Sequence, residues 1–185
     1  MEAWTTAAPY LAVVGLIVAF IIYVRLKSGD PGSAQMIEIA DDIHDGAMAF
    51  LKREYSILLV FIVVVFIALW LGVGDRTALA FLAGAGSSIL AGFSGMKAAT
   101  LANVRTAQAA NQRGQGPALS TAFAGGAVMG LAVASLGLLG ISVLAHLFGV
   151  WEDTSNAAVI NGFAMGASSI ALFARVGGGI FTKAA

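Results

Sequence analysis

YSILLVFIVVVFIALWLGVG, from Tyr55 to Gly74, is an uncharged and almost entirely apolar stretch. A run of about 18 apolar residues or more is typical of a membrane-spanning helix, because about 20 residues rising about 1.5 Å each cross a hydrocarbon core. Four further uncharged runs exceed that length: Ala3 to Val24, Thr77 to Met96, Gly114 to Trp151 and Thr154 to Ala174. The sequence therefore predicts five transmembrane helices.

The composition agrees with this interpretation. Of the 185 residues, 59% are hydrophobic and 11% are charged, against roughly 45–50% and about 25% in soluble domains. This composition therefore argues against a soluble enzyme, a disordered tail and a nucleic-acid binder. A β-barrel would alternate in hydrophobicity, which this chain does not do. The absence of cysteine excludes disulfides, thiolate metal sites and a cysteine nucleophile. We predict an all-α integral membrane protein without a separate soluble domain.

The basic residues predict the orientation of the helices. The predicted spans are residues 5–26, 55–74, 77–98, 117–148 and 156–180. If the amino terminus lies outside, Arg76 is the single basic residue at an outer end. The other nine lie at cytoplasmic ends: Arg25, Lys27, Lys52, Arg53, Lys97, Arg105, Arg113, Arg175 and Lys183. This positive-inside asymmetry predicts an external amino terminus.

The segment between the first two spans is amphipathic. Its apolar face carries Met36, Ala40, Ile43, Ala47 and Phe50, and its acidic face carries Glu38, Asp41, Asp42 and Asp45. The carboxylates could attract a divalent cation, or they could form the solvated face of a helix that leads into the second span. The two histidines, at positions 44 and 146, are isolated from other ligand types, so we predict no metal site.

Small residues indicate close helix packing. Gly126 and Gly130 form a GxxxG pair, and Gly162 and Gly166 form a second one. Such pairs let the backbones of two helices approach each other, and packing of this kind drives association within lipid. The pairs predict a compact bundle.

The carboxyl end holds the candidate functional residues. Arg175 is the single charged residue between Thr154 and Thr182, so it either anchors the fifth span at the cytoplasmic surface or faces a polar cavity. The glycines at positions 177–179 could break the helix or allow close packing. Lys183 lies further into the cytoplasm, where a lysine is either a simple anchor or a phosphate-binding charge.

RVGGGIFTKAA, from Arg175 to Ala185, closely resembles a signature of the membrane-integral, ion-pumping inorganic pyrophosphatases. Three more segments match this family in order: GAMAFLKREY (46–55), SGMKAATLANVRT (94–106) and GGAVMGL (125–131). The resemblance covers nearly the whole chain. It implies that these residues are the first five helices of a sixteen-helix bundle, with a DVGAD segment following Ala185.

The resemblance also implies the roles of the two cations. Lys183 matches the lysine that contacts pyrophosphate, and Arg175 matches the arginine of the ion pathway, whose acidic partners lie on later helices. The aspartates that bind Mg²⁺ lie beyond this chain, so no catalytic residue is expected within it. K⁺ dependence is possible, and the full-length protein is expected to be a homodimer in a prokaryotic cell (inner) membrane.

The function implied is coupling of Mg²⁺-pyrophosphate hydrolysis to H⁺ translocation, with Na⁺ as the alternative ion. On this interpretation the chain is an amino-terminal fragment that is inactive alone. The alternative from another class is a non-catalytic membrane subunit or a segment of a secondary transporter. Against it, the chain shows no convincing inverted repeat.

Overall fold

The computed structural model describes the backbone of residues 2–184 and the side chains of residues 6–154 and 156–179. The elements within this part of the chain are α1 (Glu2–Lys27), α2 (Ala34–Gly72), α3 (Asp75–Arg113), α4 (Gln115–Leu147), a short 3-10 helix η1 (Thr154–Ala157) and α5 (Ala158–Ala184). Five of these helices are long and apolar enough to cross a membrane. The predicted class and the predicted number of helices are confirmed.

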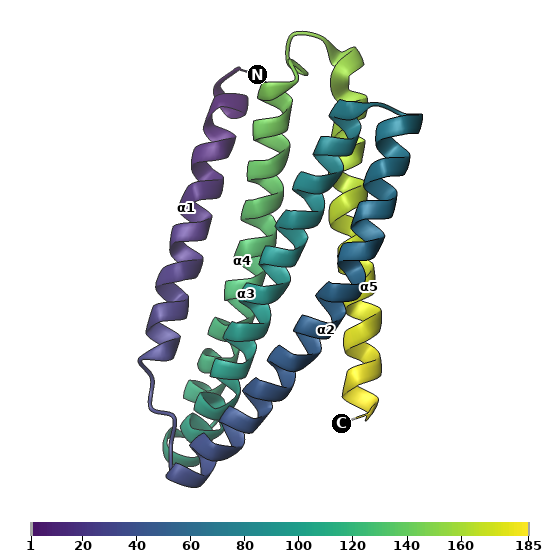
Figure 1. Cartoon of the computed structure of the whole chain (residues 1–185). Helices are drawn as coiled ribbons and strands as arrows, with labels where there is room; N and C mark the ends of the chain where they lie inside the picture. The colour runs from purple at the N-terminus through teal and green to yellow at the C-terminus, as the bar shows by residue number, and fades with distance from the viewer. Residues whose placement is uncertain (1, 185) are drawn as a thin grey trace.

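The helices form one elongated bundle, in which α1 begins at the upper end and α5 ends in the lower part, short of the tip formed by α2, α3 and α4 (Figure 1). α3 lies at the centre and packs against α4, α5 and α2, whereas α1 packs mainly against α4. Phe81 of α3 and Ile170 of α5 are the largest fully buried side chains among the described residues. Together with Leu58 and Ile62 of α2 they form the main apolar cluster.

Two helices are much longer than the spans predicted from their uncharged runs. α2 and α3 each have 39 residues, which is about 58 Å of helix, against a hydrocarbon core of about 30 Å. α3 continues past residue 98 to Arg113, and only Gly114, with φ 82°, separates it from α4. The charged residues that end the uncharged run therefore do not end the helix. Where the bilayer begins and ends along these helices stays a prediction.

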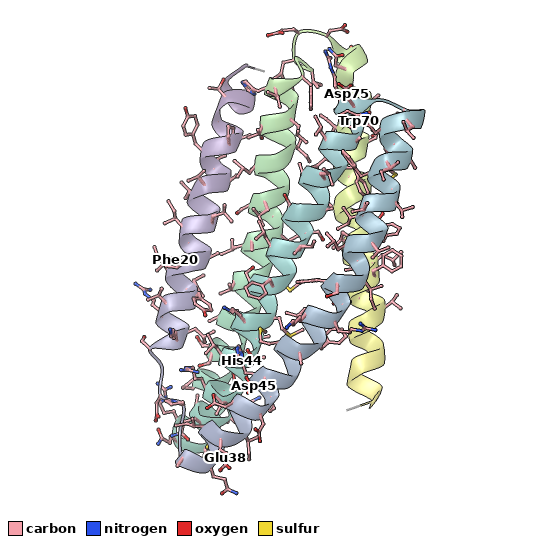
Figure 2. All side chains as sticks on the ribbon, in the orientation of Figure 1. Phe20, Glu38, His44, Asp45, Trp70 and Asp75 are labelled. Atoms are coloured by element: carbon pink, nitrogen blue, oxygen red, sulfur yellow. The ribbon has the colours of Figure 1, made fainter. Side chains whose placement is uncertain are left out.

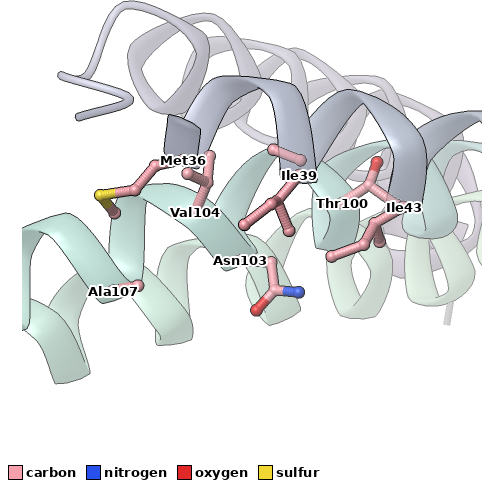
Figure 3. A pocket seen from close by; sticks show the side chains of 8 residues that line it. Met36, Ile39, Ile43, Thr100, Asn103, Val104 and Ala107 are labelled. Carbon is pink, nitrogen blue, oxygen red and sulfur yellow. The ribbon is translucent and has the colours of Figure 1, made fainter. Parts of the chain in front are cut away.

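The amphipathic segment is the first half of α2. Its apolar face lies along the extended end of α3, and Figure 3 shows Ile39 and Ile43 of α2 facing Thr100 and Val104 of α3 around a small cavity. The four predicted acidic residues, Glu38, Asp41, Asp42 and Asp45, are all exposed. Figure 2 shows Glu38 and Asp45 at the lower end of α2, which favours the solvated-face interpretation.

His44 lies on the side of α2 that contacts α3. It is half-buried, and its Nδ1 atom forms a hydrogen bond of 3.0 Å with Thr100 Oγ1. This histidine therefore joins the two helix extensions.

Glycines bring α3 and α5 into backbone contact. A Cβ atom on Gly166 would collide with the carbonyl oxygen of Phe81, and one on Gly84 would collide with that of Phe163. The GxxxG pair of α5 therefore packs as predicted. The pair in α4 does not, because Gly126 and Gly130 face open space within the described residues. A GxxxG pattern shows that one face of a helix carries small residues, but it does not show whether another helix covers that face.

The linker between α1 and α2 is tied to α3 by two side chains. Arg105 donates from Nε to the Gly29 carbonyl at 3.1 Å and from Nη2 to the Lys27 carbonyl at 2.9 Å. One turn further along α3, Gln108 donates to Asp30 at 3.0 Å. The two Arg105 bonds satisfy carbonyl groups at and just after the end of α1, which have no partner within the helix.

Protonation of Asp30 is expected to loosen this linker. The Gln108 hydrogen bond, and then the Gly32 N–H, hold the pKa of Asp30 below its ordinary 3.8. A carboxylate with a lowered pKa in the folded state stabilises that state above its unfolded pKa of about 3.9, and this contribution is lost as pH falls through the lowered value. A spin label at the exposed Gln35 should therefore gain mobility below about pH 4. Asp30→Ala should show that mobility at neutral pH, and an unchanged spectrum in this variant would contradict the assignment.

Candidate functional site

The carboxyl half of α5 is a continuous helix. It passes through the glycines at positions 177–179 and ends at Ala184, so these glycines do not break it. Instead, Gly177 allows close packing, because a Cβ atom there would lie 2.5 Å from Glu54 Oε1 and 3.5 Å from Phe50 Cζ. The first glycine of the motif therefore makes room for a carboxylate of α2.

Glu54 is a candidate site residue that the sequence analysis missed. Its Oε1 atom is buried and has no hydrogen-bond partner among the described residues. A buried polar atom without a partner costs free energy, so such an atom often marks a place where another group binds. The sequence signal was present, because Glu54 directly precedes the uncharged run of the second span. A charge at the end of a span is ordinarily a surface residue, and only the packing of α2 against α5 shows otherwise.

Arg175 lies on the opposite side of α5 from this contact. It is exposed and precedes Gly177 by two residues, which is about 200° around the helix. Its side chain forms no hydrogen bond or ion pair with any described residue. The structure therefore places Arg175 on a face that α2 and α3 leave uncovered, and its role stays a prediction.

The uncovered face of α5 carries a polar stripe. Asn161 and Ser168 are both exposed and precede Arg175 by fourteen and seven residues, so the three share one face of the helix. Arg175 is thus the charged member of this polar row. The sequence shows the seven-residue spacing, which places the three residues on one face of α5. Only the structure shows that the opposite face is the one that packs against α2.

Lys183 lies in the last turn of α5, but its side chain is outside the described residues. Eight residues separate it from Arg175, which is about 12 Å along the helix axis. The two predicted site residues are therefore on one rigid element, with Lys183 nearer the end of the bundle where α2 and α3 extend (Figure 1). Their relative position comes from helix geometry alone.

The described residues contain no group of three or more His, Asp or Glu side chains that could hold a metal ion. The carboxylates of Glu38, Asp41, Asp42 and Asp45 are exposed, and Glu54, whose Oε1 atom is buried, is not grouped with them. The side chains described here therefore do not fit a Mg²⁺ site.

Comparison with known proteins identifies the family. The family described as "Inorganic H+ pyrophosphatase" matches residues 13–185. The chain is 51% identical over its whole length to a candidate K⁺-stimulated pyrophosphate-energized sodium pump of Clostridium tetani, and covers 27% of that protein. It is 46% identical over its whole length to a K⁺-insensitive pyrophosphate-energized proton pump of Methanosarcina mazei, and again covers 27%.

A third relative is the K⁺-stimulated pyrophosphate-energized sodium pump of Thermotoga maritima. It is 42% identical over 83% of this chain, which covers 24% of that pump. The chain thus spans about a quarter of the length of the relatives it matches. Because the family match extends through all five helices, this chain belongs to the inorganic H⁺ pyrophosphatase family.

Proposed function

We propose that this chain is the amino-terminal part of a membrane pyrophosphatase that couples hydrolysis of Mg²⁺-pyrophosphate to H⁺ translocation. The observation that carries the proposal is the family match over residues 13–185, which includes the whole of α5 and both of its cationic site residues. The relatives that it matches are each named as pyrophosphate-energized pumps. On this proposal the active protein is longer than the chain and lies in a prokaryotic cell (inner) membrane as a homodimer.

Within this proposal the two cations of α5 act on different steps. Lys183 neutralises pyrophosphate, which is a compact polyanion whose hydrolysis depends on stabilising negative charge. Arg175 lies about 12 Å away along the helix axis, where it faces the ion pathway and pairs with carboxylates of later helices. Residues beyond this chain supply the Mg²⁺ ligands and activate the attacking water. K⁺ acts as a further cofactor if the protein resembles its K⁺-stimulated relatives.

Na⁺ is the second candidate for the transported ion, because two of the three relatives above are named as sodium pumps. The two ions are separated by measuring pyrophosphate-dependent uptake into vesicles in buffers with and without Na⁺. Uptake of H⁺ in the absence of Na⁺ supports the proposal. A strict requirement for Na⁺, with no H⁺ uptake, would assign the alternative.

Replacement of Arg175 tests whether Arg175 acts in ion transport and Lys183 in hydrolysis. In the longer protein reconstituted in vesicles, Arg175→Ala should lower ion uptake per pyrophosphate hydrolysed by about tenfold, because a neighbouring cation shifts the pKa of a carboxylate by about 1–3 units. Arg175→Lys should retain hydrolysis but pump poorly, since lysine lacks the planar fork that holds two carboxylates.

Arg53→Ala is the matched control, because Arg53 is an exposed arginine on α2 at the same predicted side of the membrane. It should leave the ratio of uptake to hydrolysis unchanged. The 185-residue chain alone provides the blank, with no Mg²⁺-dependent hydrolysis expected. Normal pumping per pyrophosphate in both Arg175 variants would make Arg175 a cytoplasmic anchor.

A further inference from the structure

A polar cavity lies where α1 ends, between that end and the junction of α3 with α4. It has a volume of about 370 Å³. Its polar lining consists of Arg25, Asp30, Arg105, Arg113, Ser120 and Thr121, and we call it the arginine pocket. The family signature at the carboxyl end of α5 contributes none of these residues. Three arginines from two helices therefore meet in one pocket that the proposed function does not use.

The floor of the arginine pocket is held rigidly. Arg105 is bonded to carbonyl groups at the end of α1, and Asp30 accepts hydrogen bonds from Gln108 and from the Gly32 N–H. A guanidinium has five N–H donors, and Arg105 uses three of them, including one to the Leu101 carbonyl. The other two N–H groups of Arg105 have no partner among the described residues and are available to a ligand.

The charge of the pocket is not balanced. Three arginines face one aspartate, and both oxygens of that aspartate already accept hydrogen bonds. The side chains of Arg25 and Arg113 are exposed and form no hydrogen bond or ion pair with any described residue. The Ser120 hydroxyl likewise has no partner in the part of the chain that the structure describes, whereas the Thr121 hydroxyl donates to the Pro117 carbonyl at 2.9 Å. The lining therefore offers several donors and a net positive charge to an anion.

The shape of the donors indicates which anion they suit. Arginine forks match the oxygens of a phosphate or carboxylate through paired hydrogen bonds. The pocket also has an apolar wall, formed by Ile22 and Leu26 of α1 and Ala124 of α4. It lies at the end of the candidate span Thr6–Lys27, which is the depth of a lipid headgroup if α1 crosses the bilayer. A free inorganic phosphate would leave this apolar wall without a partner.

We propose that the arginine pocket binds the phosphate group of an anionic phospholipid, with Arg25 and Arg113 as its ligands and Arg105 as the fixed base of the site. The glycerol and acyl chains of the lipid lie along the wall formed by Ile22 and Leu26. The lipid bridges the end of α1 and the α3–α4 junction, whose residues line the pocket together. This binding does not depend on pyrophosphate hydrolysis.

The test uses the longer protein, purified in neutral detergent and stripped of lipid. Phosphatidylglycerol or phosphatidylcholine with identical acyl chains is then titrated, and bound lipid is counted by native mass spectrometry. Phosphatidylglycerol should be retained selectively. The double variant R25Q/R113Q should bind it about 25-fold more weakly, since each basic residue near anionic lipid contributes about fivefold. R25K/R113K should bind with intermediate affinity, because it keeps the charges and loses the forks.

The matched control is K52Q/R53Q, which removes two exposed cations at the same predicted membrane surface, outside the pocket. It should retain phosphatidylglycerol with wild-type affinity. Equal binding of the two lipids, or wild-type affinity in R25Q/R113Q, would overturn the site. If millimolar inorganic phosphate displaced phosphatidylglycerol, the proposal of a lipid ligand would be wrong, and the pocket would be assigned to a soluble anion.

Discussion

Replacing Lys183 with alanine in the longer protein is expected to lower kcat for pyrophosphate hydrolysis by about 10²- to 10³-fold, the usual effect of removing one preorganised stabilising group. The reason is electrostatic, because the reaction spreads negative charge over phosphate oxygens and Lys183 is proposed to neutralise part of it. Lys183→Arg should restore a fraction of the rate, since it keeps the charge with a different geometry. The measurement is phosphate release at saturating Mg²⁺-pyrophosphate.

Lys52→Ala is the control for this experiment. Lys52 is an exposed lysine of α2, in a segment that matches the family but to which no contact with pyrophosphate is assigned. Its removal should leave both kcat and KM within about twofold of wild type, as is usual for surface substitutions. Unchanged kcat and KM in Lys183→Ala would reduce Lys183 to a surface anchor and would remove the substrate contact from the proposed function.

Replacing Gly166 with valine is expected to disrupt the packing of α3 against α5. The added side chain would meet the backbone at Phe81 and Ala85, which cannot rotate away as a side chain can. Overpacking in a core usually costs about 1–3 kcal/mol, and a backbone obstacle places this substitution at about 3 kcal/mol or above. In detergent, the melting temperature of the 185-residue chain should fall sharply and its elution profile should broaden.

Gly130→Val supplies the contrast, because Gly130 belongs to the other GxxxG pair and faces open space within the described residues. The same change of side chain should alter the stability of the 185-residue chain by less than about 0.5 kcal/mol, as for an exposed site. Equal destabilisation by the two substitutions would contradict the prediction that close packing of α3 against α5 requires a glycine at position 166.

The site was only partly predictable from the sequence. Arg175 was a candidate because a charge within a long uncharged segment is costly, and Lys183 because it lies within a motif that resembles a known family. Glu54 was missed, although it directly precedes the second predicted span. Its carboxylate matters because α2 crosses α5 at Gly177, and a crossing point depends on how two remote segments pack. The arginine pocket was missed for the same reason, since its three arginines appeared only as separate markers of orientation.

The sequence by itself determined the class of the protein and the number of its long helices. Apolar runs of this length, without the alternation of a β-barrel, form helices in lipid, because a helix pairs its backbone N–H and C=O groups within the segment. That argument is local and needs no knowledge of the partner helices. The sequence also accounted for the exposed carboxylates at the start of α2, because helical periodicity places them on one face and the apolar residues on the other.

Only the tertiary structure decided where the helices end and which faces they share. Charges ended the uncharged runs, but α3 continues to Arg113 because the extended ends of α2 and α3 pack on each other outside the predicted spans. Two identical GxxxG patterns had different outcomes, since Gly166 meets the backbone of α3 and Gly130 meets nothing among the described residues. The physical reason is that packing energy depends on the distance between atoms of remote segments, and a local pattern does not contain that distance.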